Sequence, residues 1–127
     1  MIRIYGLDAQ LGAIRARMST EIHACMMEVL GLPHGKRAHR FIRLQPEDFV
    51  VPEGRSERYT VLEINLMEGR SPETRRRLIK ALFARFEKAL GIAPVDLEIT
   101  LFESPGCNWG FRGLVGDEAQ LSYEIQV

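Results

Sequence analysis

A strand–helix–strand pattern occurs twice in this chain, and the repetition is the strongest constraint on its fold. Residues 2–44 and 59–103 can be aligned, and both pass through a similar sequence just after the expected helix. That sequence is Leu30-Gly31-Leu32-Pro33 in the first half and Leu90-Gly91-Ile92-Ala93-Pro94 in the second. The duplication predicts an α+β fold, an α/β sandwich in which one four-stranded mixed sheet carries two helices on one face, plus short extra strands.

The first half predicts a strand at residues 2–7, a helix from about Gly12 to Leu30 and a strand at residues 38–44. Apolar residues spaced by three and four predict the helix: Ile14, Met18, Ile22, Cys25, Met26, Val29 and Leu30. Gly31 and Pro33 should end this helix, because glycine tolerates a left-handed cap and proline cannot continue a helix.

The second half predicts a strand at residues 59–67, a helix opening at Ser71-Pro72-Glu73 and a strand at residues 97–102. Serine caps free backbone amides, proline suits the first helical position, and glutamate complements the helix dipole. Two weaker patterns indicate a short edge strand at Phe49-Val50-Val51 and a C-terminal strand at the alternating Leu121, Tyr123, Ile125 and Val127.

The composition is that of a single domain over residues 1–127. Seventeen basic side chains balance seventeen acidic ones, so no net field recruits nucleic acid or an anionic membrane. The longest apolar runs are only a few residues, so no transmembrane helix is expected. The chain lacks a secretion signal, and Cys25 and Cys107 form no disulfide framework, so we expect a cytoplasmic protein.

A sheet with both helices on one face leaves its other face uncovered. Val61 and Met67 of the expected strand at residues 59–67 belong to that second face. Exposed strands are prone to pair with other chains. We therefore expect a homo-oligomer whose subunits cover each other's sheets.

Arg70 is the first candidate ligand-binding residue. It lies between the end of a strand and the start of a helix, where open α/β sheets bind ligands and helix amides favour anions. A guanidinium at this place can hold a carboxylate through two parallel hydrogen bonds. A solvated surface arginine is the competing interpretation.

The amine of Met1 is the second candidate, because the first expected strand begins directly after it. An α-amine has a reference pKa of about 7.7–8.0, close enough to neutrality for proton transfer. Methionine before Ile2 is normally retained, so the amine should be primary. Taken alone, a frayed terminus is the simpler interpretation of Met1.

The segment from Ser104 to Gly113 carries Cys107, Trp109, Phe111 and Arg112. The two aromatic residues suit the wall of an apolar pocket, to which Arg112 would add a charge. A packing or subunit-contact loop explains the same residues equally well. Cys107 is not expected to be a nucleophile, because no neighbouring base can be identified.

The basic segment from His34 to Arg40 is better explained as a solvated loop than as a nucleic-acid contact, because the net charge is zero. The three histidines are not grouped with carboxylates at a metal-ligand spacing, so no metal is expected. Gly110, Gly113 and Gly116 form no dinucleotide fingerprint, and no cofactor is expected.

Several segments, taken in order, resemble the tautomerase superfamily, in particular its branch of longer subunits that includes malonate semialdehyde decarboxylase. The matching segments are Leu30-Gly31-Leu32-Pro33, Val61-Leu62-Glu63-Ile64 leading to Gly69-Arg70-Ser71, and Asn108-Trp109-Gly110-Phe111. The resemblance covers nearly the whole chain and implies a duplicated β-α-β fold assembled as a homotrimer. It also implies a pocket in which an N-terminal amine acts as acid and base beside arginines that bind a keto or enol acid.

The resemblance also marks departures in this chain. Members of the superfamily use an N-terminal proline, whereas this chain begins with Met1. Arg70 falls on a carboxylate-binding arginine, but the companion arginine two residues earlier is replaced by Glu68. A pocket aspartate is replaced by Lys36.

The first functional hypothesis is an isomerase or lyase that acts on a small 2-oxo or enolisable carboxylic acid. In it Arg70 holds the carboxylate, and the Met1 amine moves a proton or forms an imine. Lys36 is a spare amine or a second cation that lowers the pKa of the first. Trp109 and Phe111 exclude water.

Two other hypotheses remain open from the sequence. A non-catalytic homotrimer could bind a small acid or a protein partner through the same cleft, which the missing proline and Glu68 favour. A regulatory ligand-binding domain of similar topology is the third, and it is weakened because the chain carries no second domain to regulate.

Overall fold

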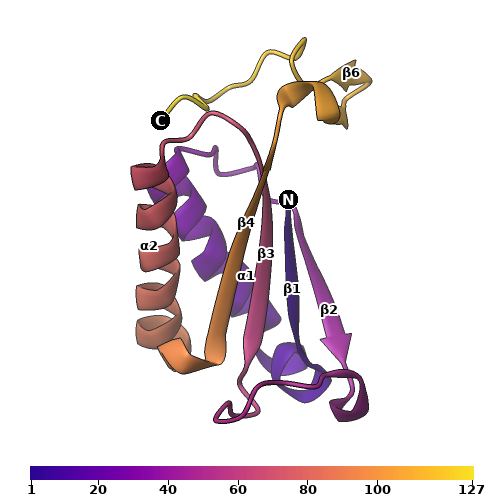
Figure 1. The fold of residues 1–127 in the computed structure, drawn as a ribbon, viewed down its shortest axis with the longest axis vertical. Coiled ribbons are helices and arrows are strands. Elements are labelled where there is room, and N and C mark those ends of the chain that lie inside the picture. Colours follow the sequence, from indigo (N-terminus) through magenta and orange to yellow (C-terminus); the bar gives the residue numbers. More distant parts are fainter.

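A four-stranded sheet with two helices on one face forms the body of the structure, a computed structural model that describes residues 1–127 (Figure 1). The sheet and helices follow in the order β1 (Ile2–Leu7), α1 (Asp8–Leu30), β2 (His39–Leu44), β3 (Thr60–Met67), α2 (Pro72–Leu90) and β4 (Leu97–Ser104). A small hairpin, β5 (Gly110–Phe111) and β6 (Leu114–Val115), follows β4, and three short 3-10 turns lie at Pro46–Asp48, Pro94–Asp96 and Gly106–Asn108. The predicted duplicated β-α-β fold is confirmed.

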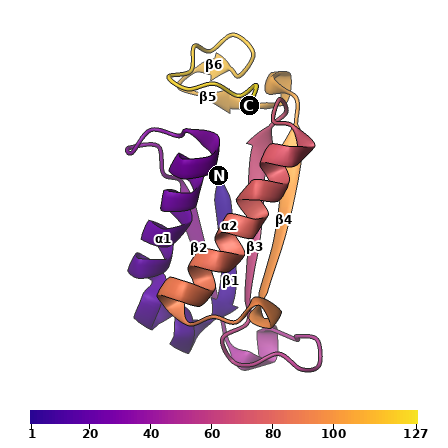
Figure 2. The same cartoon turned by 90° about the vertical axis from the view of Figure 1, so that its left-hand side faces the viewer.

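The two halves of the chain run in opposite directions within one sheet. The strand order is β2-β1-β3-β4, with β1 parallel to β2, β3 parallel to β4, and β1 antiparallel to β3. The starts of β1 and β2 and the ends of β3 and β4 therefore meet at the same end of the sheet, where the N-terminus also lies (Figure 1). The β5–β6 hairpin and the C-terminal segment cross above this end (Figure 2).

The core lies between the sheet and both helices. Every second residue of β1 and β3 packs inward against the apolar stripes of α1 and α2, and the completely buried members of this cluster are Ile4, Leu11, Met18, Ile22, Cys25, Leu62, Ile64, Leu78, Leu82 and Phe86. Full burial of such a side chain stabilises a fold by about 1.5–3 kcal/mol. This alternation fixes which side chains of each strand face the helices and which face outward.

Both helices end as the sequence predicts. Gly31 and Gly91 adopt left-handed caps with φ of 69° and 65°. The hydroxyl of Ser71 accepts a hydrogen bond from the Thr74 amide at 3.1 Å, and α2 begins at Pro72. Helix α1 begins at Asp8, one turn before the predicted start. Leu11 is the only buried residue of that first turn, so the apolar spacing gave little sign of it.

Two strand predictions are wrong. Residues 49–51 follow a 3-10 turn without pairing, and residues 116–127 contain no strand. The alternation of Leu121, Tyr123 and Ile125 reflects one-sided contact with the body of the protein, since each of these residues is half-buried and its neighbours are exposed. No strand of either sheet pairs with this segment in a hydrogen-bonded ladder.

The C-terminal segment is instead attached to the start of α2. The hydroxyls of Thr74 and Ser71 donate to the carbonyl of Val127. Gly69 allows close contact here, since its φ is +141° and a Cβ atom would lie 2.5 Å from Cγ2 of Ile125. These contacts place residues 121–125 over the end of the sheet.

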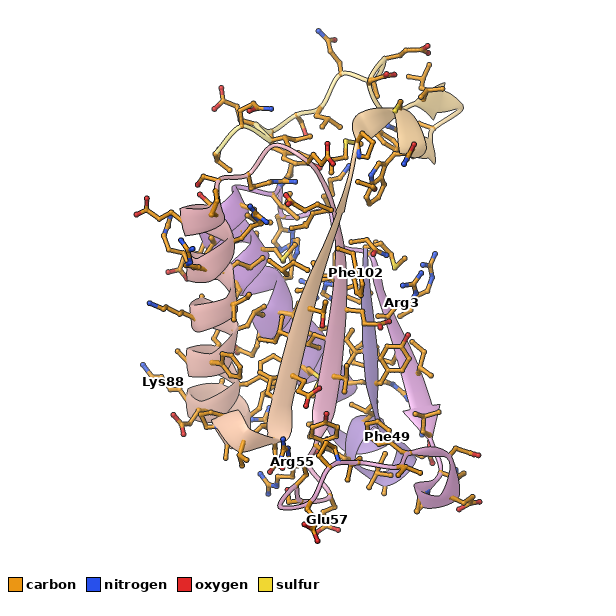
Figure 3. The ribbon with its side chains drawn as sticks, in the orientation of Figure 1. Arg3, Phe49, Arg55, Glu57, Lys88 and Phe102 are labelled. Atoms are coloured by element: carbon orange, nitrogen blue, oxygen red, sulfur yellow. The ribbon has the colours of Figure 1, made fainter.

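The sheet face turned away from the helices is partly apolar. Phe102 points outward from β4 and is 47% exposed, and Arg3 of β1 lies on the same face (Figure 3). Val61 and Met67 of β3 also face outward. No helix of the structure combines the length and apolar character that crossing a bilayer requires.

The Gly69→Ala substitution should detach the C-terminal segment. Its Cβ atom would collide with Ile125, in addition to the backbone strain of about 1–3 kcal/mol that residues other than glycine meet in such sparsely populated conformations. We expect a lower melting temperature and faster amide exchange in residues 117–127.

Gly54→Ala is the matched control, because Gly54 also has positive φ, +82°, but a Cβ atom there would contact nothing. It should lower stability without changing exchange in the C-terminal segment. Equal exchange in the two variants would contradict the proposed attachment.

Candidate active site

A cavity of about 420 Å³ opens at the end of the sheet where the N-terminus lies. Its volume is in the range typical of small-molecule sites. Five of the six site residues predicted from the sequence line it: Met1, Lys36, Arg70, Trp109 and Phe111. The structure thus gathers residues that are more than one hundred positions apart in the chain.

The cavity is strongly cationic although the chain has no net charge. Lys36, Arg40 and Arg70 line it together with the Met1 amine, and none of the lining residues is an aspartate or a glutamate. A concave surface lined by one sign of charge concentrates ions of the opposite sign. The arrangement therefore suits a small anion.

Arg70 is a buried cation without a carboxylate partner. Only 6% of its surface is exposed, and it takes part in none of the ion pairs of the structure. Nη1 donates to the Met67 carbonyl at 3.2 Å, whereas Nε is buried and has no acceptor. Burial lowers the pKa of Arg70, while Tyr123 and the charge of Glu103 act in the opposite direction. A guanidinium stays charged in proteins, so Arg70 is a buried cation that no carboxylate contacts directly.

The Met1 amine is held by the sheet. It donates to the Asn65 carbonyl at 3.2 Å, and the Asn65 amide donates to the Met1 carbonyl at 2.9 Å. Burial lowers the pKa of this amine below its ordinary value of 8.0, and Arg40, Lys36, Arg3 and Arg70 lower it further in that order. A larger fraction of the amine is therefore unprotonated near pH 7, and this form can accept a proton.

Lys36 enters the cavity from the loop between α1 and β2. Its ammonium lies 5.4 Å from the ring centre of Phe111 and 5.3 Å from that of Tyr123. Such cation–π contacts hold the ammonium over the two ring faces. The charge of Lys36 is one of those that lower the pKa of the Met1 amine.

The aromatic wall comes from the segment after β4 and from the C-terminal segment. Trp109 donates its indole N–H to the Ser104 hydroxyl at 2.9 Å, which fixes the ring. Phe111 and Tyr123 are half-buried and both face Lys36. Tyr123 also lies under the Arg70 guanidinium, with 5.9 Å between Cζ and the ring centre.

Two residues considered from the sequence lie outside the cavity. Arg112 is exposed, stacks on the outer side of Phe111 at 5.2 Å and donates to the Gln120 carbonyl at 3.3 Å. It does not line the cavity. Glu68 is also exposed and outside the lining, so its charge does not face a bound anion.

Sequence reasoning missed Arg40, His39 and Tyr123 as lining residues. Arg40 and His39 begin β2, and the parallel pairing of β1 with β2 could have placed them beside Met1, because Ile2 pairs with His39. Tyr123 carried no usable signal, because its position depends on how the C-terminal segment folds back. No cluster of three or more metal-ligating side chains occurs among the residues of the chain.

The fold and the cavity together define a class: a two-layer β-α-β protein with a cationic cavity around the start of its first strand. Residues 36–112, more than half of the chain, match the family model described as "Tautomerase enzyme". The chain belongs to this tautomerase family.

Solved structures of low sequence identity share the fold. A malonate semialdehyde decarboxylase superposes with a TM-score of 0.82 and 22% identity, over 91% of this chain and 93% of that one. A fused 4-OT gives 0.82 and 16%, over 92% and 96% of the two chains. A member of the cis-3-chloroacrylic acid dehalogenase family gives 0.79 and 15%, over 90% and 81%.

The Met1 amine should titrate below its ordinary pKa of 8.0, because it is buried among cations. Arg40→Ala should raise that pKa, since Arg40 is the largest charge contribution after burial. The rate of amine acylation as a function of pH, read at Met1 by mass spectrometry, measures both values.

Lys88→Ala is the control, because it also removes one positive charge. Lys88 lies at the end of α2 that is farther from the cavity, and it points into solvent (Figure 3). It should leave the titration of Met1 unchanged. A wild-type amine that titrates at 8.0 or above would contradict the described environment.

Proposed function

We propose that this protein is a tautomerase-type enzyme, an isomerase or a lyase, that acts on a small 2-oxo or enolisable carboxylic acid. The observation that carries the proposal is Arg70, a buried guanidinium without a carboxylate partner in a cavity that also holds the Met1 amine. An organic acid would supply the missing counter-charge and place its carbon skeleton beside a base.

Binding begins with the charge of Arg70. Nη1 is engaged by Met67, and the rest of the guanidinium has donors left for a carboxylate. Hydrogen bonds to charged groups contribute about 1.5–3 kcal/mol each, more than neutral ones. Lys36 and Arg40 add attraction for the anion before it enters.

The Met1 amine then moves a proton. In its neutral form the nitrogen takes a proton from the carbon next to the carbonyl group. The electrons of that C–H bond form a carbon–carbon double bond, and the π electrons of the carbonyl group move onto its oxygen. The resulting ammonium returns the proton to the oxygen or to another carbon, which completes the tautomerisation. With an aldehyde or ketone the same primary amine can form an imine and release water.

The surrounding residues keep this chemistry efficient. Trp109 and Phe111 exclude water from one side of the cavity, which strengthens the electrostatic interactions inside it. Lys36 keeps the pKa of Met1 low by like-charge repulsion.

Borohydride trapping tests the amine directly. Incubation with pyruvate or with a semialdehyde, followed by reduction, should add one reduced ligand at the nitrogen of Met1, identified by peptide mass spectrometry. Lys36→Arg keeps the cation but removes the second primary amine of the cavity, so the adduct should persist in this variant.

An adduct that vanishes in Lys36→Arg would assign the reactive amine to Lys36. No adduct, together with no enol–keto conversion above background, would support the alternative of a non-catalytic acid-binding protein. Intact mass measurement of the purified protein checks that Met1 is its first residue.

Arg70→Ala should weaken binding of a 2-oxo acid about 10- to 100-fold, because it removes charged hydrogen bonds. Arg70→Lys should lose less, since it keeps the charge but not the planar donor geometry. Calorimetric titration with pyruvate measures the loss.

Arg76→Ala is the control for Arg70. It removes an exposed arginine in the first half of α2, close in sequence to Arg70 but outside the cavity lining. Wild-type affinity in Arg70→Ala would remove the main support for the proposed function.

We also propose that the protein assembles as a homotrimer through the outer sheet face. Fused 4-OT structures of the same fold are described as symmetric and asymmetric trimers. In this chain Phe102 and Val61 offer apolar contacts on that face. Burial of such a surface between subunits follows from the hydrophobic effect.

Phe102→Glu should convert the trimer into monomers, because it places a charge in the proposed interface. Val50→Glu is the control, since Val50 is 95% exposed in a loop away from the sheet face. Light scattering after gel filtration measures the mass, and a monomeric wild type would contradict the proposal.

A further inference from the structure

His39 stands at the cavity without a role in the proposed chemistry. It is the first residue of β2, pairs with Ile2 of β1, and its side chain lines the cavity. The ring packs edge to face against that of buried His23, with 6.3 Å between the ring centres. The imidazole is therefore held in place by a strand and a helix.

A hydrogen bond from α1 holds Nδ1 of His39. The Ser19 hydroxyl lies 2.8 Å from Nδ1 of His39, and Nη1 of Arg37 donates to the same hydroxyl oxygen at 3.4 Å. In the tautomer in which the hydroxyl donates to Nδ1, the proton of the neutral ring is on Nε2. This is the tautomer that can donate into the cavity.

The surroundings keep this ring neutral. Burial lowers the pKa of His39 to about 4, and Arg37, His23 and the Met1 amine add to the effect. These three groups come from the loop before β2, from α1 and from the start of β1, and no carboxylate lines the cavity to oppose them. A histidine in this state donates from Nε2 without carrying a charge of its own.

Nε2 makes no hydrogen bond within the chain and is not among the enclosed polar atoms that lack a partner. We propose that His39 donates its Nε2–H to the carbonyl oxygen of the bound acid and stabilises the negative charge that develops there on enolisation. This inference rests on the proposed function, with Arg70 on the carboxylate and the Met1 amine on the α-proton. No covalent bond to His39 forms or breaks.

The assignment gives the three polar groups separate tasks. A charged donor at this position would bind the carboxylate as well as the carbonyl and would lose the distinction between the two ends of the substrate. A neutral donor acts mainly where new charge appears, which is the way in which preorganised donors lower a barrier.

Ring nitrogen-15 NMR on the wild-type protein tests the tautomer and the contact together. His39 should show a protonated Nε2 and an unprotonated Nδ1 from pH 5 to 8, because its pKa of about 4 lies below this range. Addition of pyruvate should shift the Nε2 signal of His39, while the signals of exposed His34 should stay unchanged.

Variants separate donation from packing. His39→Leu should lower kcat about 100-fold or more with little change in KM, the usual cost of removing one such donor. His39→Gln keeps an N–H near the place of Nε2 and should recover most of the activity that His39→Leu loses. Ser19→Ala should release the tautomer and allow both protonated forms in the spectrum.

The outcomes distinguish this inference from the proposed function. Pyruvate binding that depends on Arg70, with an unmoved His39 signal and full activity in His39→Leu, overturns the role of His39 and leaves the proposed function intact. Absence of any pyruvate binding overturns both. Equal losses in the Leu and Gln variants would show a packing role and would also overturn the donor.

Discussion

The proposed chemistry of this protein depends on one buried positive charge. Arg70 lies at the end of the central strand β3, 6% exposed and without a carboxylate to balance it. An unpaired buried charge costs several kcal/mol in effective desolvation, which the rest of the fold must offset. A bound carboxylate would reduce that cost, and the proposed function takes this gain as the source of affinity for an organic acid.

The duplicated fold explains why this charge and an amine share one cavity. Each half is a parallel β-α-β unit, but the halves are antiparallel to each other, so the start of β1 lies beside the end of β3. Two hydrogen bonds join the backbone of Asn65 in β3 to Met1 and fix the position of the amine beside this strand. The same pairing that closes the sheet therefore sets the position of the amine relative to Arg70, which follows three residues after β3.

Local patterns predicted the body of the fold and part of the site. The glycine caps at Gly31 and Gly91 and the Ser71 cap have local physical causes, and the structure confirms them. Local patterns put Arg70 at the end of one strand and Met1 at the start of another, and only the resemblance to the tautomerase superfamily implied that they share one pocket. Their functional roles remain predictions.

The remaining residues of the site depend on tertiary structure. Tyr123 alternates with apolar neighbours as in a strand, but its segment has no strand to pair with and is attached to α2 through Thr74 and Val127. The hydrogen bond at Nδ1 of His39 comes from Ser19, twenty residues earlier, which α1 brings within 2.8 Å. Arg112 lies outside the cavity, at the turn of the β5–β6 hairpin, where its backbone adopts a positive φ of 54°.

The most direct test of the account is a crystal structure of the protein with a bound 2-oxo acid. The account predicts the carboxylate paired with the Arg70 guanidinium and the carbon next to the carbonyl group facing the nitrogen of Met1. A ligand bound elsewhere, or an N-terminus turned away from Arg70 in every subunit, would contradict it.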